Sequence, residues 1–162
     1  MPQLRFGLQK YFTHRLSSNM YRPQYFKIQE LVCPDVHRAF GERAWTFFDE
    51  KLLKTLDHIR EHLGPLLVNN WFGGGGFDER GFRCIKCDMV RTAMLENKIY
   101  VSAHMTGQGV DFDCQGMEAS EVRAWITENQ NTMPHNIRLE NGVSWVHIDT
   151  RDMGIKIFFF TT

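Results

Sequence analysis

The chain has 162 residues, enough for one domain with a hydrophobic core of its own. Hydrophobic residues make up 43% and charged residues 23% of the total, as is typical of a soluble globular protein. The formal net charge is zero, which argues against nucleic acid or an anionic membrane as a partner held by bulk electrostatics.

Residues 1–25 are predicted to form a basic N-terminal arm, since no acidic residue precedes Glu30. A solvated terminus explains this arm better than contact with an anionic polymer. No apolar run has the length of an export signal or of a transmembrane span. We therefore expect synthesis in the cytoplasm, with four reduced cysteines, and favour a monomer.

Residues 26–162 are predicted to fold as one α+β domain with a largely antiparallel sheet and flanking helices. The segment 26–33 is an entry segment with alternating apolar residues. An apolar stripe at spacings of three and four residues predicts a helix over 43–63, ended by Gly64 and Pro65. The segment "LLVNNW" (66–71) is predicted to be a buried strand, and 72–83 a glycine-rich loop.

The second half of the chain is predicted to form mainly strands. We expect strands in "KIYVSAH" (98–104), "VDFD" (110–113) and "GIKIFFF" (154–160), and an amphipathic helix over 118–129. Asn141-Gly142 between two alternating segments predicts a β-hairpin. On its second strand the side chains of Val143, Trp145, His147 and Asp149 would share one face.

Two pairs of potential metal ligands lie outside the main candidate site. His58 and His62 are one helical turn apart, which suits a metal pair but is more typical of a helix surface. Cys84 and Cys87 form a C-x-x-C motif, but no second pair follows as a structural zinc site requires, so two loop cysteines are favoured.

The main candidate site consists of His104, Asp111 and His147. Catalytic zinc takes three ligands from histidine and carboxylate side chains and keeps a fourth position free. His104 ends one predicted strand and Asp111 begins the next, so the loop with Gly107 and Gly109 can bring them together. Spacing alone leaves open the alternatives of a lone histidine and a turn-forming aspartate.

The stretch "SAHMTGQGVD" (102–111) resembles the Ser-x-His-x-x-Gly-x-Ala-x-Asp motif of the M15 family of zinc D-Ala-D-Ala peptidases. "WVHID" (145–149) is similar to that family's downstream ligand motif, and "VNNWFGGGGFDERGFR" (68–83) to the segment that ends in its substrate-binding arginine. The likeness covers roughly residues 26–151 and is greatest to the small M15 proteins of phages and prophages. It implies the fold shared by hedgehog signalling domains and DD-peptidases.

This resemblance implies one zinc ion held by His104, Asp111 and His147. It also implies a substrate-binding serine at Ser102 and, at Arg83, an arginine that binds substrate and stabilises developing negative charge; Arg80 is a less favoured register. Trp145 is expected either to form a wall of the substrate site or to be a core aromatic residue.

The chain departs from the M15 pattern at two places. Gly109 replaces an alanine, which we expect to loosen the loop mildly. Ser144 stands three residues before His147, where many members carry the catalytic acid. Other members place a glutamate about six residues before that ligand, and Glu140, seven before it, is our candidate for the general base.

The function implied by the resemblance is that of a zinc metallopeptidase acting on peptidoglycan stem peptides. It would cleave a bond involving a D-amino acid, as a D-Ala-D-Ala carboxypeptidase or an endopeptidase. A phage or prophage lysin that is released to the cell wall is one form that such an enzyme takes. The alternatives are a non-catalytic, metal-containing binding module on the same scaffold and, less favoured, a structural protein of a phage particle.

Overall fold

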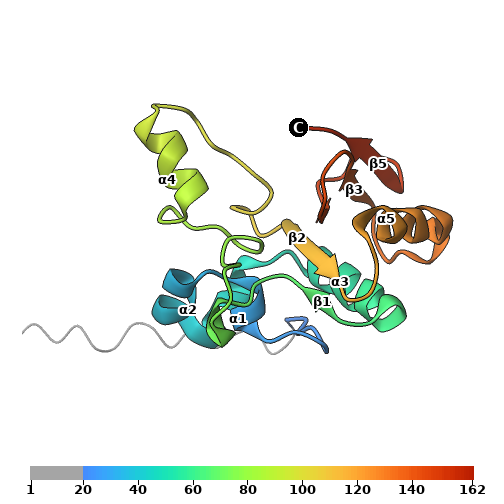
Figure 1. The fold of residues 1–162 in the computed structure, drawn as a ribbon, viewed down its shortest axis with the longest axis horizontal. Coiled ribbons are helices and arrows are strands. Elements are labelled where there is room, and N and C mark those ends of the chain that lie inside the picture. The colour runs from blue at the N-terminus through green and yellow to red at the C-terminus, as the bar shows by residue number, and fades with distance from the viewer. Residues whose placement is uncertain (1–19) are drawn as a thin grey trace, which may run out of the picture.

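The sheet at the centre of the computed structural model has five strands in the order β1-β2-β4-β3-β5 (Figure 1). Three of its four pairings are antiparallel, and β3 pairs with β5 in parallel. The sheet is therefore mixed, within a single small α+β domain that the structure describes for residues 20–162. The strands are β1 (Leu66–Leu67), β2 (Gly109–Cys114), β3 (Ile137–Glu140), β4 (Val146–Asp149) and β5 (Ile157–Phe160).

Five α-helices and three short 3-10 helices accompany the sheet in the described residues. α3 and α5 lie beside the strands, whereas α1, α2 and α4 gather away from β3 and β5 (Figure 1). No helix in residues 20–162 is long and apolar enough to cross a membrane. The helices are α1 (Ile28–Leu31), α2 (Pro34–Phe40), η1 (Gly41–Phe47), α3 (Glu50–Leu63), η2 (Trp71–Gly73), α4 (Asp88–Leu95), α5 (Ala119–Glu128) and η3 (Gln130–Thr132).

The helix predicted over 43–63 is present only from Glu50 to Leu63, as α3. Its first part belongs to η1, and the backbone is extended at Phe48 and Asp49. Asp49 then caps α3 by accepting a hydrogen bond from the Lys51 backbone N–H at 2.9 Å. An aspartate that satisfies a free N–H in this way starts a new helix, and the apolar periodicity continues across the break without revealing it.

Two predicted strands are wrong or much shorter than expected. The segment 98–104 is not a strand: its alternating apolar residues Ile99 and Val101 are 95% and 72% exposed, so no neighbouring strand covers them. The strand predicted over 66–71 is reduced to the two residues of β1. The entry segment 26–33 contains the short helix α1, with Ile28 and Leu31 buried.

The predicted hairpin is present as β3 and β4, but its connection is a five-residue loop rather than a two-residue turn. Gly142 has the positive φ (83°) that the Asn-Gly signal anticipates. Arg123 of α5 donates hydrogen bonds to the carbonyls of Val143 and Trp145, at 3.1 and 2.9 Å. Val143 and Trp145 therefore lie in the loop before β4, and of the four residues predicted to share a strand face only His147 and Asp149 belong to the strand.

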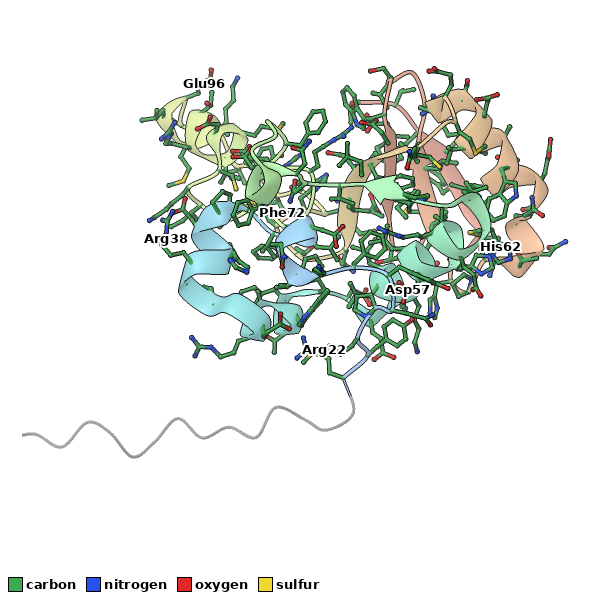
Figure 2. The ribbon with its side chains drawn as sticks, turned by 60° about the horizontal axis from the view of Figure 1, so that its bottom comes forward. Arg22, Arg38, Asp57, His62, Phe72 and Glu96 are labelled. Carbon is green, nitrogen blue, oxygen red and sulfur yellow. The ribbon has the colours of Figure 1, made fainter. Side chains whose placement is uncertain are left out.

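Part of the predicted N-terminal arm packs on the domain. Residues 1–19 lie outside the described residues, but Tyr21 and Tyr25 pack against the core. The buried carboxylate of Asp57 on α3 accepts hydrogen bonds from the Tyr21 hydroxyl (2.7 Å) and from the backbone N–H groups of Gln24 (2.6 Å) and Tyr25 (3.2 Å) (Figure 2). Asp57 therefore joins residues 21–25 to α3.

We expect Asp57→Asn to lower the free energy of unfolding by about 2 kcal/mol, because the NH2 group that replaces one carboxylate oxygen cannot accept a hydrogen bond from residues 21–25. Urea denaturation followed by circular dichroism measures this change. Glu61→Gln, an exposed substitution on the same helix, is the matched control and should change stability by less than ~0.5 kcal/mol. Equal stabilities for the two variants would contradict a role for Asp57 in holding residues 21–25.

Candidate metal centre

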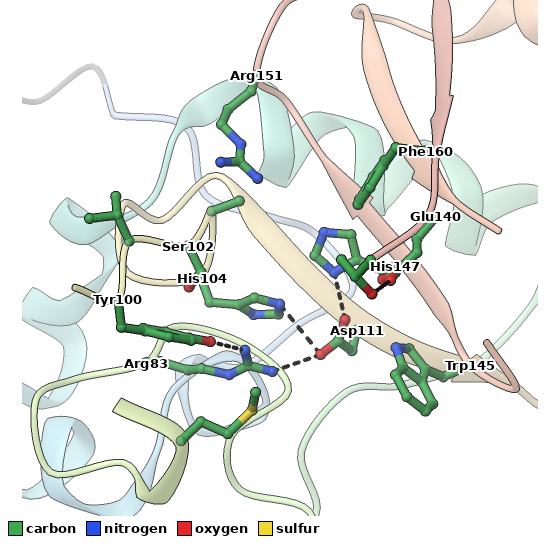
Figure 3. Close-up of a pocket in the computed structure, with 14 residues that line it drawn as sticks. Arg83, Tyr100, Ser102, His104, Asp111, Glu140, Trp145, His147, Arg151 and Phe160 are labelled. Atoms are coloured by element: carbon green, nitrogen blue, oxygen red, sulfur yellow. Dashed lines mark hydrogen bonds and ion pairs between the residues drawn. The ribbon is translucent and has the colours of Figure 1, made fainter. Parts of the chain in front are cut away.

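His104, Asp111 and His147 meet in one buried group at the middle of the sheet (Figure 3). Asp111 in β2 and His147 in β4 are partners in the antiparallel register, so their side chains project on the same face. His104 reaches this face from the turn before β2. One ligand atom of each residue lies within 4.8 Å of the others, so the group can hold a metal ion.

The two histidines are oriented by hydrogen bonds on their far nitrogens. His104 Nδ1 lies 2.8 Å from the carbonyl oxygen of Gly81. Because a carbonyl oxygen can only accept a hydrogen bond, Nδ1 carries the proton, and Nε2 keeps a lone pair that can bind a metal. His147 Nε2 lies 3.4 Å from Asp149, a carboxylate held by Arg138 and Arg151. His147 Nδ1 therefore faces the centre. Such outer partners fix ring orientation in metal sites.

The charges of this group follow from burial and from its hydrogen bonds. Burial lowers the pKa of His104, which therefore stays neutral. Burial alone would raise the pKa of Asp111, but the hydrogen bond from His147 outweighs it and holds that pKa well below the usual range. Burial also lowers the pKa of His147, but Asp111 and Asp149 raise it to about 9. A metal ion would displace the proton between His147 and Asp111.

The loop between the first two ligands needs both of its glycines. Gly107 has φ +68°, and a Cβ there would lie 1.8 Å from the carbonyl oxygen of Phe47. At Gly109 a Cβ would lie 2.6 Å from the Cβ of Ala103. The expectation that Gly109 merely loosens the loop is therefore wrong, because an alanine does not fit here unless Ala103 moves.

We expect Gly109→Ala to lower the free energy of unfolding by about 2 kcal/mol, as is usual for overpacking. The double variant Ala103→Gly/Gly109→Ala should recover part of this loss, because the two methyl groups exchange places. Urea denaturation of the two single variants and the double variant measures the coupling between them. Strictly additive changes would show that the contact at Ala103 is not what requires glycine.

A cavity of about 480 Å³ opens onto the three ligands. All the other residues assigned to the site from the sequence also line it: Arg83, Ser102, Glu140 and Trp145. They come from separate parts of the fold, namely the loop before α4, the turn before β2, the end of β3 and the β3–β4 loop (Figure 3). The structure thus brings together the predicted set, whereas Ser144 is exposed and does not line the cavity.

Arg83, and not Arg80, reaches the centre. The buried Arg83 guanidinium donates to Asp111 Oδ2 at 2.9 Å, to the Tyr100 hydroxyl at 2.9 Å and to the Glu79 carbonyl at 2.6 Å. Arg83 therefore positions the candidate ligand Asp111. Each of its two terminal guanidinium nitrogens has a second N–H that these bonds do not use. Arg80 instead forms a bidentate ion pair with Asp113, at 2.6 and 3.0 Å.

Glu140 lies beside His147. The β3–β4 register pairs Leu139 with Ile148, so the next residue of β3, Glu140, lies towards His147 on the cavity side (Figure 3). The Glu140 carboxylate is buried and accepts a hydrogen bond from the Thr162 hydroxyl. A carboxylate in this place can exchange a proton with a molecule in the cavity.

Ser102 and Trp145 differ in their surroundings. Within residues 20–162, Ser102 Oγ is the one buried side-chain nitrogen or oxygen without a hydrogen-bond partner. A buried hydroxyl at a cavity wall is available to a ligand. The Trp145 side chain is 38% exposed at the rim, so it is a wall residue and not a core aromatic.

Two further residues of the site, Tyr100 and Arg151, are not among those expected from the sequence. Both line the cavity; Tyr100 binds Arg83, and Arg151 binds Asp149. Tyr100 lies in the segment mistaken for a strand, and no spacing signal marks it. Arg151 follows Asp149 by two residues, the spacing of one strand face, which is the only local signal for it.

The histidine pair on α3 does not belong to a metal group in the described chain. The rings of His58 and His62 lie 4.4 Å apart and both approach Trp125 of α5. His62 Nδ1 lies 2.8 Å from the backbone oxygen of His58. The pair packs against a neighbouring helix, in agreement with the helix-surface interpretation.

Comparison of the chain with family models, with curated proteins and with solved structures finds no match. The site is therefore defined by its own geometry, and the class of protein that it supports is a candidate metal-binding α+β domain.

Proposed function

We propose that this chain is a zinc peptidase that resembles the M15 family and hydrolyses a bond involving a D-amino acid in peptidoglycan stem peptides. The observation that carries the proposal is the buried His104-Asp111-His147 group at the base of a cavity. The motif around the first two ligands and the "WVHID" segment support the family resemblance.

The donor set suits zinc. Two imidazole nitrogens and one carboxylate oxygen are ligands typical of catalytic zinc, and they leave one position open towards the cavity. The hydrogen bond from His104 to Gly81 and the pairing of His147 with Asp149 are the outer partners that such ligands require. When bound, Zn²⁺ would polarise the scissile carbonyl and lower the pKa of a water molecule.

The remaining cavity residues supply the groups that peptide hydrolysis needs. Glu140 would take a proton from the attacking water and return it to the leaving amine. The free N–H groups of Arg83 would bind the developing oxyanion or a substrate carboxylate. Ser102 Oγ would hydrogen-bond the peptide, and Trp145 would pack against it from the rim.

The proposal is tested with the purified full chain and muropeptides that end in D-Ala-D-Ala. Zinc-loaded protein is expected to shorten the peptides, and liquid chromatography with mass spectrometry identifies the bond by the fragment released. A chelator should stop cleavage, and added zinc should restore it. Zinc binding without cleavage would instead favour the binding-module alternative, and absence of zinc at His104, Asp111 and His147 would reject both.

A further inference from the structure

Three of the four cysteines form a second cluster, away from the candidate metal centre. Cys33 precedes α2, Cys84 follows Arg83, and Cys87 precedes α4. Cys84 Sγ lies 3.6 Å from Cys33 Sγ and 4.0 Å from Cys87 Sγ. All three sulfur atoms lie within 4.8 Å of one another.

The backbone brings the cysteines together. Val32 and Phe82 form a parallel β-bridge, and the Phe82 N–H donates to the Leu31 carbonyl at 2.8 Å. The residues that follow each side of this bridge therefore run beside each other, and Cys33 meets the C-x-x-C turn. In Figures 1 and 2, α2 and α4 lie on the same side of the molecule, away from β3 and β5.

The sulfur spacing matches a single tetrahedral ion. Three thiolates bound to zinc at about 2.3 Å lie about 3.8 Å apart, close to the Sγ–Sγ distances of 3.6 and 4.0 Å in this cluster. Backbone N–H groups already point at the sulfurs: that of Lys86 donates to Cys84 Sγ at 3.4 Å, and that of Cys84 to Cys87 Sγ at 3.2 Å. Such N–H groups stabilise thiolate charge.

We propose that Cys33, Cys84 and Cys87 bind a second zinc ion, distinct from the ion at His104, Asp111 and His147. Cys33 and Cys87 line an adjoining cavity of about 250 Å³, from which a fourth ligand would come. Carboxylates at its wall, or water, complete the coordination; the acidic residues there are Asp35, Asp78, Glu79 and Asp88.

The task of this ion is structural. It would join the segment before α2 to the segment 81–87. That segment carries Gly81, whose carbonyl orients His104, and Arg83, which binds Asp111. A thiolate site here would therefore hold Gly81 and Arg83 in place beside the candidate metal centre. The proposal of this second site does not depend on any activity of that centre.

Cobalt substitution under reducing conditions tests the second site, because thiolate ligands give Co²⁺ intense near-ultraviolet charge-transfer bands that nitrogen and oxygen ligands do not. The wild-type chain should show these bands and bind two zinc ions by elemental analysis. His147→Ala should keep the bands and bind one ion. Cys84→Ser should lose the bands and also bind one ion. Cys114→Ser is the matched control, since Cys114 is buried elsewhere and bonds to the Leu63 carbonyl.

Absence of charge-transfer bands from the reduced wild-type chain would overturn the proposal, whether or not any cysteine variant folds. Recovery of Cys33 and Cys84 as a disulfide that excludes metal after reduction and refolding would also overturn it. The bands with no peptide cleavage would leave the second site standing and count against the proposed peptidase. Peptide cleavage without the charge-transfer bands would support the peptidase and reject the second zinc site. Each proposal can therefore fail without the other.

Discussion

His147→Ala is expected to abolish zinc binding at the histidine–aspartate centre, and peptide cleavage with it. Loss of an outer partner alone weakens metal sites by roughly 10- to 100-fold, so loss of a direct ligand should cost more than ~100-fold in affinity. The change also removes the 2.6 Å contact of His147 Nδ1 with Asp111, which leaves the buried carboxylate to His104 and Arg83. Calorimetric zinc titration and muropeptide digestion measure the two losses.

The titration is made in the Cys84→Ser background, so that the proposed thiolate site does not contribute zinc binding. His135→Ala is the matched control, because His135 lines a different cavity and is not part of the ligand group. It should retain the zinc affinity and the cleavage rate of the parent chain. Unchanged zinc affinity in the His147→Ala variant would show that this residue is not a ligand.

The candidate ligands could be named from the sequence because local signals and the M15-like motifs together mark each of them. A glycine-bearing turn joins His104 to Asp111, and an Asn-Gly hairpin carries His147 on a strand. What the sequence does not contain is the pairing of β2 with β4. This antiparallel register sets Asp111 opposite His147 and turns separate motifs into one group.

The errors have a common cause, which is that they depend on contacts between distant residues. Cys33 and Cys84 are 51 residues apart, so no local spacing marks Cys33 as a neighbour of the C-x-x-C motif. The exposure of Ile99 and the contact between Gly109 and Ala103 likewise depend on tertiary packing. Alternation and spacing report local geometry only, and tertiary contacts override them.

Glu140→Gln is expected to lower the cleavage rate by roughly 10²- to 10⁴-fold while zinc binding stays intact. The amide keeps the size of the side chain and can still pair with the Thr162 hydroxyl, but it cannot take a proton from water. Because Glu140 is not one of the candidate ligands, zinc affinity should match that of the parent chain. Steady-state kinetics on the muropeptide and a zinc titration separate the two quantities.

The same variant also discriminates between the peptidase and the binding module. A peptidase loses turnover in Glu140→Gln but still binds the peptide, whereas a binding module has no turnover to lose. Glu128→Gln, an exposed change at the end of α5, is the matched control and should leave both quantities unchanged. Full cleavage by Glu140→Gln would remove Glu140 as the base. Ser144 could not replace it, because its exposed hydroxyl does not line the cavity. Apart from the ligands, the titratable groups left at the cavity wall would then be Arg83, Tyr100 and Arg151.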